Sequence, residues 1–245
     1  EINYRDWSSD VCSSDLGIRM FPEFALTHAW LIPLLPAVAF LIIGGLTRQN
    51  KNTSAVIAIA FSSLSFLLAV GVLLAVIRGP IVMADPFVMK TLWAKIGHIE
   101  LAMGVLVDPL TAMMLMVVTT VSLLVQIYSV GYMAHDPGAG RFFAFLSLFA
   151  SSMLGLVISV NFLQMYAFWE LVGLCSYLLI GFYYYKDSAR EAAKKAFITT
   201  RIGDFGMLLG ILLLQITVGS LDFVELRTLI PTTRSEERRV GKECR

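Results

Sequence analysis

The stretch from Asn161 to Tyr184 reads NFLQMYAFWELVGLCSYLLIGFYY, and it decides the fold class of this chain. About 20 predominantly apolar residues are enough for a helix to cross the hydrocarbon core of a bilayer. One carboxylate, Glu170, interrupts this run near its middle. An ionisable residue at that depth costs about 2.5–3.5 kcal/mol on insertion scales and usually marks an ion pathway or a proton relay. Glu170 is therefore the first candidate functional residue.

The composition places the whole chain in the same class. Hydrophobic residues make up 57% of it and charged residues 15%, whereas a soluble domain averages about 25% charged. The net charge of +1 gives no reason to expect a nucleic-acid partner. The sequence has no Gly-rich phosphate loop, no Cys or His cluster and no nucleophile–base motif, so we expect no cofactor or metal on this chain.

Apolar segments between polar links predict an all-α, polytopic transmembrane helix bundle with about six spans. A further segment, LDFVELRTLI, is predicted to be a short amphipathic helix on the membrane surface. The expected spans are 29–46, 55–77, 109–132, 142–160, 161–184 and 193–218.

Helix-capping residues mark several of the expected starts. Asp108 followed by Pro109 is a strong start signal for the third span, with Asp at N-cap and Pro at N1. Asn52 or Ser54 is expected to cap the second span, and Ser188 the charged stretch before the sixth. Residues 80–107 mix short apolar runs with charges, which predicts an extramembrane loop or short hairpin at the interface.

The two ends differ in character from the rest of the chain. Asp6–Leu16 reads DWSSDVCSSDL and Arg234–Cys244 reads RSEERRVGKEC, and both resemble translated sequencing adapters. We interpret 1–19 and 234–245 as artefactual, the alternative being genuine hydrophilic tails. Between them we expect two parts: 20–140 with the first three spans and the 80–107 loop, and 141–233 with the later spans and the surface helix. On this interpretation Cys175 is the only native thiol, and native sequence continues past Thr233.

Positive charges in the links predict the orientation, because loops on the cytoplasmic side carry an excess of Lys and Arg. With the N-terminus outside, inside links hold Arg48, Lys51, Arg141, Lys186, Arg190, Lys194 and Lys195, whereas outside links hold Arg78, Lys90, Lys95 and Arg227. This asymmetry favours an outside N-terminus.

The sixth span keeps two charges inside an apolar helix. Arg201 and Asp204 are spaced i, i+3, so they can pair directly. Lys195, about two and a half turns before Asp204, is expected to face the same side as Asp204, while Lys194 is expected to anchor at the interface. Together with Glu170 these residues make a candidate proton relay. The alternatives are a protonated Glu170 held for packing specificity, and an Arg201–Asp204 pair that only makes insertion tolerable.

Five separated segments together resemble a known family. They are VDPLTAMML (Val107–Leu115), YSVGYM (Tyr128–Met133), RFFAFLSLFASSML (Arg141–Leu154), FWELVGLCSYLLIGFYY (Phe168–Tyr184) and KAFITTRIGDFGMLLG (Lys195–Gly210). In this order they resemble subunit L, or chain 5, of the proton-pumping NADH:quinone oxidoreductase, respiratory complex I. Subunits of multisubunit sodium/proton antiporters and of energy-converting hydrogenases are similar.

The resemblance implies an antiporter-like proton channel built from inverted helix repeats, of which 141–233 would be the first part of one half-channel. It matches Glu170 to the family's fifth-helix glutamate, whose charge is modulated by a lysine on a broken seventh helix absent from this chain. It matches Arg201 and Asp204 to the sixth-helix charged pair, and Lys195 to the lysine of the KAF motif.

The function expected from the resemblance is proton translocation within NADH:quinone oxidoreductase. NADH, FMN, iron–sulfur clusters and quinone would then be bound by partner subunits, and this chain would carry no redox centre. The expected partners are other membrane subunits of complex I, the lipid bilayer and protons, in the bacterial plasma membrane. The alternatives are a cation/proton antiporter subunit and a hydrogenase membrane subunit.

Overall fold

The structure, a computed structural model, describes residues 21–47, 50–79, 81, 85–96 and 99–229. The adapter-like ends therefore lie outside the described residues. In chain order the elements are α2 (Leu31–Ile42), the π-helix η1 (Ile43–Thr47), α3 (Lys51–Arg78), β1 (Phe87–Ile96), β2 (Ile99–Val107), α4 (Pro109–Tyr132), α5 (Ala139–Val157), α6 (Phe162–Ile180) and α7 (Asp187–Val218).

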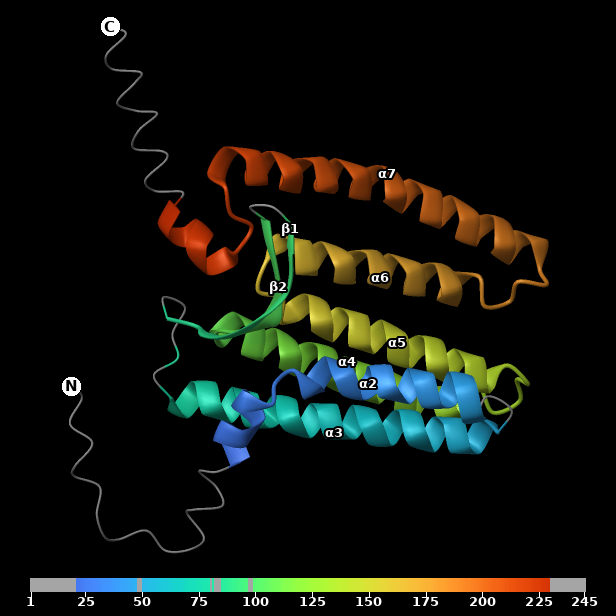
Figure 1. Ribbon diagram of the computed structural model, residues 1–245. Helices are drawn as coiled ribbons and strands as arrows, with labels where there is room; N and C mark the ends of the chain where they lie inside the picture. The colour runs from blue at the N-terminus through green and yellow to red at the C-terminus, as the bar shows by residue number, and fades with distance from the viewer. Residues whose placement is uncertain (1–20, 48–49, 80, 82–84, 97–98, 230–245) are drawn as a thin grey trace, which may run out of the picture.

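The helices lie side by side as a bundle, in which α2, α3, α4 and α5 are grouped together and α6 and α7 form an outer layer (Figure 1). Helices α2, α3, α4 and α5 form a four-helix group, in which α5 contacts each of the other three. Helix α6 packs against α5, and α7 packs against α6 at the outside of the bundle. In the most apolar 18-residue stretch of α7, 11% is buried inside the structure, whereas in that of α5 the share is 50%. The outer layer thus presents a broad apolar surface.

The prediction of an all-α membrane bundle with about six spans is confirmed. Five described helices are long and apolar enough to cross a membrane: α3, α4, α5, α6 and α7. A sixth candidate is the pair Phe21–Thr27 and Leu31–Thr47, whose two parts meet at a bend of 68°.

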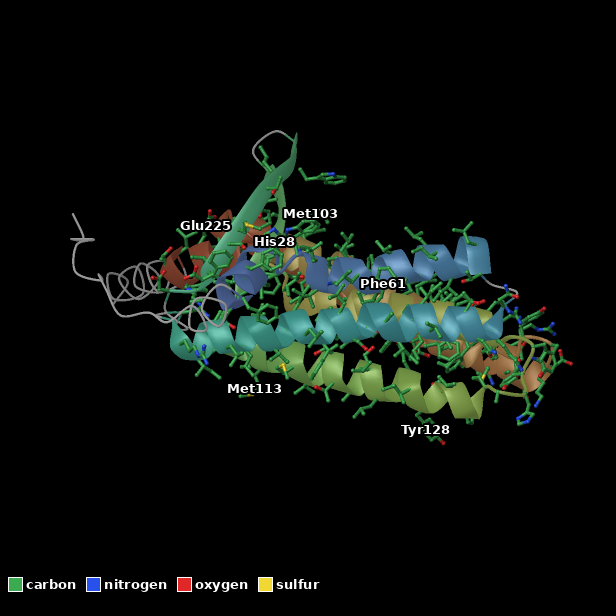
Figure 2. The ribbon with its side chains drawn as sticks, turned by 90° about the horizontal axis from the view of Figure 1, so that it is seen from below. His28, Phe61, Met103, Met113, Tyr128 and Glu225 are labelled. Carbon is green, nitrogen blue, oxygen red and sulfur yellow. The ribbon has the colours of Figure 1, made fainter. Side chains whose placement is uncertain are left out.

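Residues 80–107, predicted as a loop or short hairpin, contain an antiparallel β-hairpin of β1 and β2 with an irregularity between Leu92 and Ala94. It crosses one end of the bundle, near the short helix at 223–229 (Figure 1). In the turned view of Figure 2, Met103 of the hairpin and Glu225 lie toward this end, whereas Tyr128 lies toward the other. We refer to these as the hairpin end and the opposite end.

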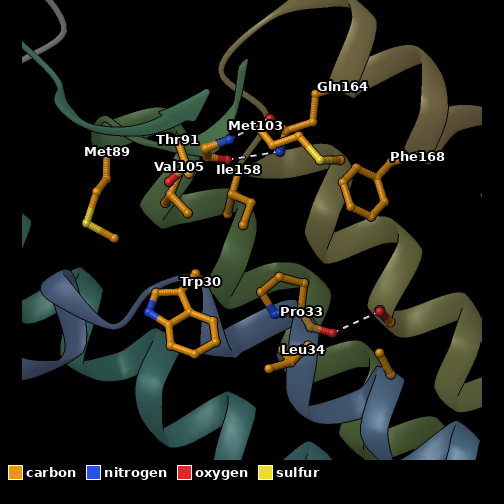
Figure 3. A pocket seen from close by; sticks show the side chains of 13 residues that line it. Trp30, Pro33, Leu34, Met89, Thr91, Met103, Val105, Ile158, Gln164 and Phe168 are labelled. Atoms are coloured by element: carbon orange, nitrogen blue, oxygen red, sulfur yellow. Dashed lines mark hydrogen bonds between the residues drawn. The ribbon is translucent and has the colours of Figure 1, made fainter. Parts of the chain in front are cut away.

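Two buried amide side chains attach the hairpin to the start of α6. The Asn161 Nδ2 donates to the carbonyl of Ala102 at 2.6 Å. Gln164 accepts from the Gly104 N–H at 3.0 Å and donates to the Gly104 carbonyl at 2.9 Å (Figure 3). A side chain at Gly104 would collide with the carbonyl of Met89 across the hairpin. The start of α6 is therefore fixed against β2.

Some predicted caps are confirmed and others are wrong. Asp108 caps α4 by accepting from the Thr111 N–H at 2.7 Å, with Pro109 at N1 as predicted. Helix α3, however, begins at Lys51, ahead of both residues proposed to cap it (Asn52 and Ser54). The Ser54 hydroxyl instead donates to the Thr47 carbonyl at 2.8 Å, which ties the helix back to η1.

Helix α7 begins at Asp187, about two turns before the predicted start of the sixth span. Ser188 is inside the helix and not its cap. The charged stretch continues the helix because charges three residues apart pair along it, Asp187 with Arg190 at 2.6 Å and Glu191 with Lys194 at 3.2 Å. The left-handed Gly219, at φ 83°, ends α7 at Val218, which is the predicted end of the sixth span.

Pro36 leaves a gap in the hydrogen bonding of α2, because a proline has no N–H to donate to the carbonyl four residues earlier. That carbonyl belongs to Ile32, and Ser65 of α3 donates its hydroxyl to it at 3.0 Å. Ser151 of α5 donates to the neighbouring Pro33 carbonyl at 2.8 Å (Figure 3). The two serines thus fix the level of α3 and α5 against the first turn of α2.

Candidate functional site

Three charged side chains from α6 and α7 meet in the middle of the bundle's outer layer. Glu170 lies near the centre of α6, about 12 Å along the axis from Phe162. Its carboxylate forms an ion pair with Arg201 of α7. Arg201 also lies 3.8 Å from the Asp204 carboxylate and donates to the backbone carbonyl of Glu170 at 3.3 Å. One guanidinium therefore bridges two carboxylates on facing helices.

Local sequence explains why the helices can hold this cluster. Gly173 lies one turn after Glu170, and a Cβ there would touch the Arg201 guanidinium at 3.4 Å. The glycine thus leaves room for the side chain that enters from α7. The Arg201 guanidinium also lies 4.5 Å from the centre of the Phe197 ring, within the range of a cation–π interaction.

Sequence reasoning did not identify Trp169 as part of this site. Its indole N–H donates to the Asp204 carboxylate at 3.0 Å, from α6 to α7. The only local signal was its position next to Glu170, since the sequence of one helix does not show which residue of another helix it will contact. Trp169 therefore holds the second carboxylate of the cluster in place.

The three side chains of the cluster are partly buried. The side chains of Arg201, Glu170 and Asp204 are 30%, 24% and 10% exposed. Two carboxylates and one guanidinium carry a formal charge of −1 when ionised. A charge of this kind in an apolar span is costly unless it is paired, so the shared arginine stabilises both acids.

A groove of about 770 Å³ opens beside the cluster, between α5, α6 and α7. Asp204 and Trp169 line it, together with the small or hydroxylated residues Gly173, Ser176, Thr199, Thr200 and Gly203. Hydroxyl groups can each donate and accept a hydrogen bond. The groove thus places hydroxyl groups beside a carboxylate that belongs to the charged cluster, and those of Thr199 and Thr200 donate to carbonyls of their own helix.

Lys195 lies apart from these three residues. The expectation that it faces the same side as Asp204 is wrong, because two and a half turns place two residues on opposite faces of a helix. Asp204 is buried toward α6, and Lys195 is exposed. Among the described residues, Lys195 joins none of the ion pairs of the cluster.

A second groove, of about 580 Å³, lies between the hairpin and α2, α5 and α6 (Figure 3). Trp30, Leu34, Met103 and Phe168 line it, and no charged side chain does. Within the described residues, no group of three or more His, Cys, Asp or Glu is arranged to hold a metal ion. The charged cluster of α6 and α7 is thus the candidate site.

Comparison with known proteins defines the class. A family described as complex I chain 5 N-terminus matches residues 93–143, and the transmembrane family of NADH:quinone oxidoreductases and Mrp antiporters matches 159–242. Among solved structures, the Mrp complex from Dietzia sp. is similar, with a TM-score of 0.63 at 25% identity over 78% of this chain and 20% of that one. An archaeal membrane-bound sulfane sulfur reductase shares the fold, with a TM-score of 0.71 at 18% identity over 84% and 40%. The chain is a membrane protein of the antiporter-like class.

Curated relatives define the family within that class. NAD(P)H-quinone oxidoreductase chain 5 of Picosynechococcus sp. is 50% identical over 203 residues, which are 80% of this chain and 30% of the relative. Chain 5 of Synechocystis sp. is 50% identical over 82% of this chain and 30% of its own length. The chain belongs to the chain 5 family of these oxidoreductases, and it spans about a third of the length of the relatives it matches.

Proposed function

We propose that the chain is part of a proton-translocating membrane subunit of NADH:quinone oxidoreductase, and that Glu170 is its switching carboxyl. The observation that carries the proposal is the single guanidinium shared by two carboxylates in the interior of two spans. NADH, FMN, iron–sulfur clusters and quinone would be bound by partner subunits. The partners of this chain would be the other membrane subunits.

In the proposed mechanism, Arg201 controls which carboxyl holds a proton. While the guanidinium pairs with Glu170, the ionised form of Glu170 is stabilised, and when the guanidinium moves toward Asp204, Glu170 can take up a proton. At about 4 Å and an effective dielectric of about 20, such a pair contributes about 4 kcal/mol. Moving one charge across 100 mV costs about 2.3 kcal/mol, so the pair is strong enough to hold or release a proton against a membrane potential.

The other members have supporting roles. Trp169 keeps the Asp204 carboxylate in place, and the groove lined by Thr199 and Thr200 would give protons access to Asp204. Lys195 stays a candidate because of its position in the KAF motif. From its exposed position it would act at the approach to the cluster and not inside it.

The experiment is Glu170→Gln in the full-length subunit within the assembled complex. Glutamine keeps the shape of the side chain but cannot change its charge, so we expect intact assembly with reduced proton pumping and reduced coupled quinone reduction. The matched control is Glu191→Gln, because Glu191 is a half-exposed carboxylate on α7 outside the cluster. Normal pumping by the Glu170 variant would contradict the proposal. A loss of assembly alone would indicate a scaffold.

A second candidate is a cation/proton antiporter subunit, which the similarity to the Mrp complex of Dietzia sp. favours. Sodium-dependent proton exchange in vesicles containing the full-length protein would support it. Genes for complex I subunits beside the intact gene would favour the oxidoreductase.

We further propose that the chain lies in the bacterial plasma membrane with its N-terminus outside. Lys51 donates to the Ala134 carbonyl at the opposite end of the bundle, where positively charged links gather. Cysteines introduced at Asp187, at this end, and at Glu225, at the hairpin end, test the orientation. An impermeant maleimide added to intact cells should label only the Glu225→Cys variant, and labelling of only the Asp187→Cys variant would reverse the orientation.

A further inference from the structure

Three buried polar side chains in the four-helix group have no hydrogen-bond partner. Gln126 of α4 is 0% exposed, and neither its amide oxygen nor its amide nitrogen is bonded. The hydroxyls of Ser147 on α5 and Ser62 on α3 are also unpaired, in side chains 0% and 4% exposed. Buried polar groups in proteins are nearly always paired with protein or water. These three residues therefore point to a ligand.

The three residues lie at a similar level of the bundle. Ser62 is one turn from Ser65 and Ser147 is one turn from Ser151, both toward the opposite end. Ser65 and Ser151 bond to neighbouring carbonyls of α2, so Ser62 and Ser147 are within about 3 Å of one another in depth. Gln126 lies about 9 Å from the end of α4, and Ser147 about 12 Å from the start of α5, at the same end.

These residues also come from helices that touch. Each of α3, α4 and α5 contacts the other two. The described residues already bury all three side chains. Helix α5 also separates α4 from α6 (Figure 1), so this layer is distinct from the Glu170 cluster.

The chain cannot satisfy the Gln126 amide in the way it satisfies the buried hydroxyls of the same helix. Thr119 donates to the Leu115 carbonyl and Ser129 to the Val125 carbonyl, each one turn back along α4. A glutamine amide has two donors and an acceptor with two lone pairs. A small molecule that both donates and accepts is needed, and water is the one that fits between closely packed helices.

We propose that Ser62, Gln126 and Ser147 form an internal water-binding site between α3, α4 and α5. The Gln126 Nε2 donates to the water oxygen, and the water donates to the Gln126 Oε1 or to a serine Oγ. A water with two to four polar partners is a stable part of a protein interior. The site joins three helices through a ligand that no side chain among the described residues replaces.

The test is a cryo-electron microscopy map of the intact complex at a resolution that shows ordered water. We expect a density peak within hydrogen-bond distance of the Gln126 amide, and its loss in the Gln126→Leu variant. A wild-type map with no peak there, or with the amide bonded directly to Ser62 or Ser147, would overturn the proposal. This wild-type result does not depend on whether the variant assembles.

Thermal stability gives a second, signed readout. If the site holds water, Gln126→Leu should lower the unfolding temperature, because both serines lose the bridging water. A dry, unpaired amide would give the reverse, since leucine would remove an unsatisfied group. Thr119→Val is the matched control on the same helix and should have a smaller effect, because its hydroxyl bonds a carbonyl of its own helix. An unchanged or raised unfolding temperature for Gln126→Leu would count against the site.

Discussion

Replacing Arg201 by methionine tests whether its positive charge stabilises the two carboxylates of the cluster. Methionine replaces the unbranched stem of arginine but has no charge, so the substitution removes the cation between Glu170 and Asp204. The cluster then changes from a formal charge of −1 to −2 inside the membrane. In contrast, Glu170→Gln changes it from −1 to 0, because Arg201 and Asp204 remain as a neutral pair.

The magnitude follows from the burial of these groups. Breaking a fully buried ion pair costs about 3–5 kcal/mol, because the remaining charge is left without a partner. Arg201 and Glu170 are 30% and 24% exposed, so solvent screens part of this cost. We expect Arg201→Met to destabilise the subunit by about 2–3 kcal/mol. In the double variant with Glu170→Gln the formal charge returns to −1, and most of the loss should be recovered.

The measurement is the thermal stability of the purified complex together with its proton pumping. The expected order of stability is wild type close to Glu170→Gln, then the double variant, then Arg201→Met. The matched control is Arg190→Met, because Arg190 pairs with Asp187 on the same helix while both are more than half exposed. Surface pairs contribute about 0–1 kcal/mol, so this control should stay near wild type.

Equal stability of Arg201→Met and Arg190→Met would refute the reasoning. A double variant that is less stable than Arg201→Met would also refute it, because removing the Glu170 charge should stabilise the protein once Arg201 is gone. A variant that is stable but does not pump would separate the two roles of Arg201, because it would show that proton transfer needs the cation and folding does not.

Three further substitutions test individual contacts. Trp169→Phe removes the indole donor to Asp204, a charge-assisted bond contributing about 1.5–3 kcal/mol, and should lower the pumping rate while the complex still assembles. Gln164→Ala removes both bonds to Gly104 and should cost about 1–3 kcal/mol per group left unpaired, measured as loss of thermal stability. Gly155→Ala places a methyl group against the ring of Phe168 on α6 and should cost about 1–3 kcal/mol, again measured as loss of thermal stability.

Each of these has a control for which we expect little or less effect. Trp93→Phe changes an indole that is 74% exposed on the hairpin and should pump normally. Gln215→Ala removes one exposed bond from a glutamine side chain to the Gly219 carbonyl, so its loss of stability should be smaller than that of Gln164→Ala. Gly131→Ala meets no atom within 4 Å and should be neutral. A control as damaging as its partner would contradict the contact in question.

The sequence predicted the spans well because the bilayer imposes a length and a polarity that can be counted along the chain. It also predicted the cap at Asp108, since capping is local and depends on residue type. The predicted cap at Ser188 places the start of this helix two residues late, because Lys186 is the N-cap of α7. The pairs Asp187–Arg190 and Glu191–Lys194, visible only once the run is helical, stabilise it as a helix.

Contacts between helices could be predicted only in part. Pairing of Arg201 with Asp204 follows from their spacing on one helix, and the structure has them 3.8 Å apart. That Arg201 lies between two carboxylates depends on how α7 is rotated against α6, which no spacing on a single helix determines. The bond from Trp169 to Asp204 depends on the same rotation. The unpaired amide of Gln126 depends on the packing of three helices.

The charge of the cluster bears on how a proton could be exchanged there. Two carboxylates and one guanidinium leave one negative charge that the described residues of the cluster do not balance. In the proposed mechanism, either a proton on one carboxyl or a further cation would neutralise it, and the two would exclude each other, because a nearby cation favours the ionised acid. A cation approaching from outside the cluster would therefore expel the proton, and its withdrawal would allow uptake.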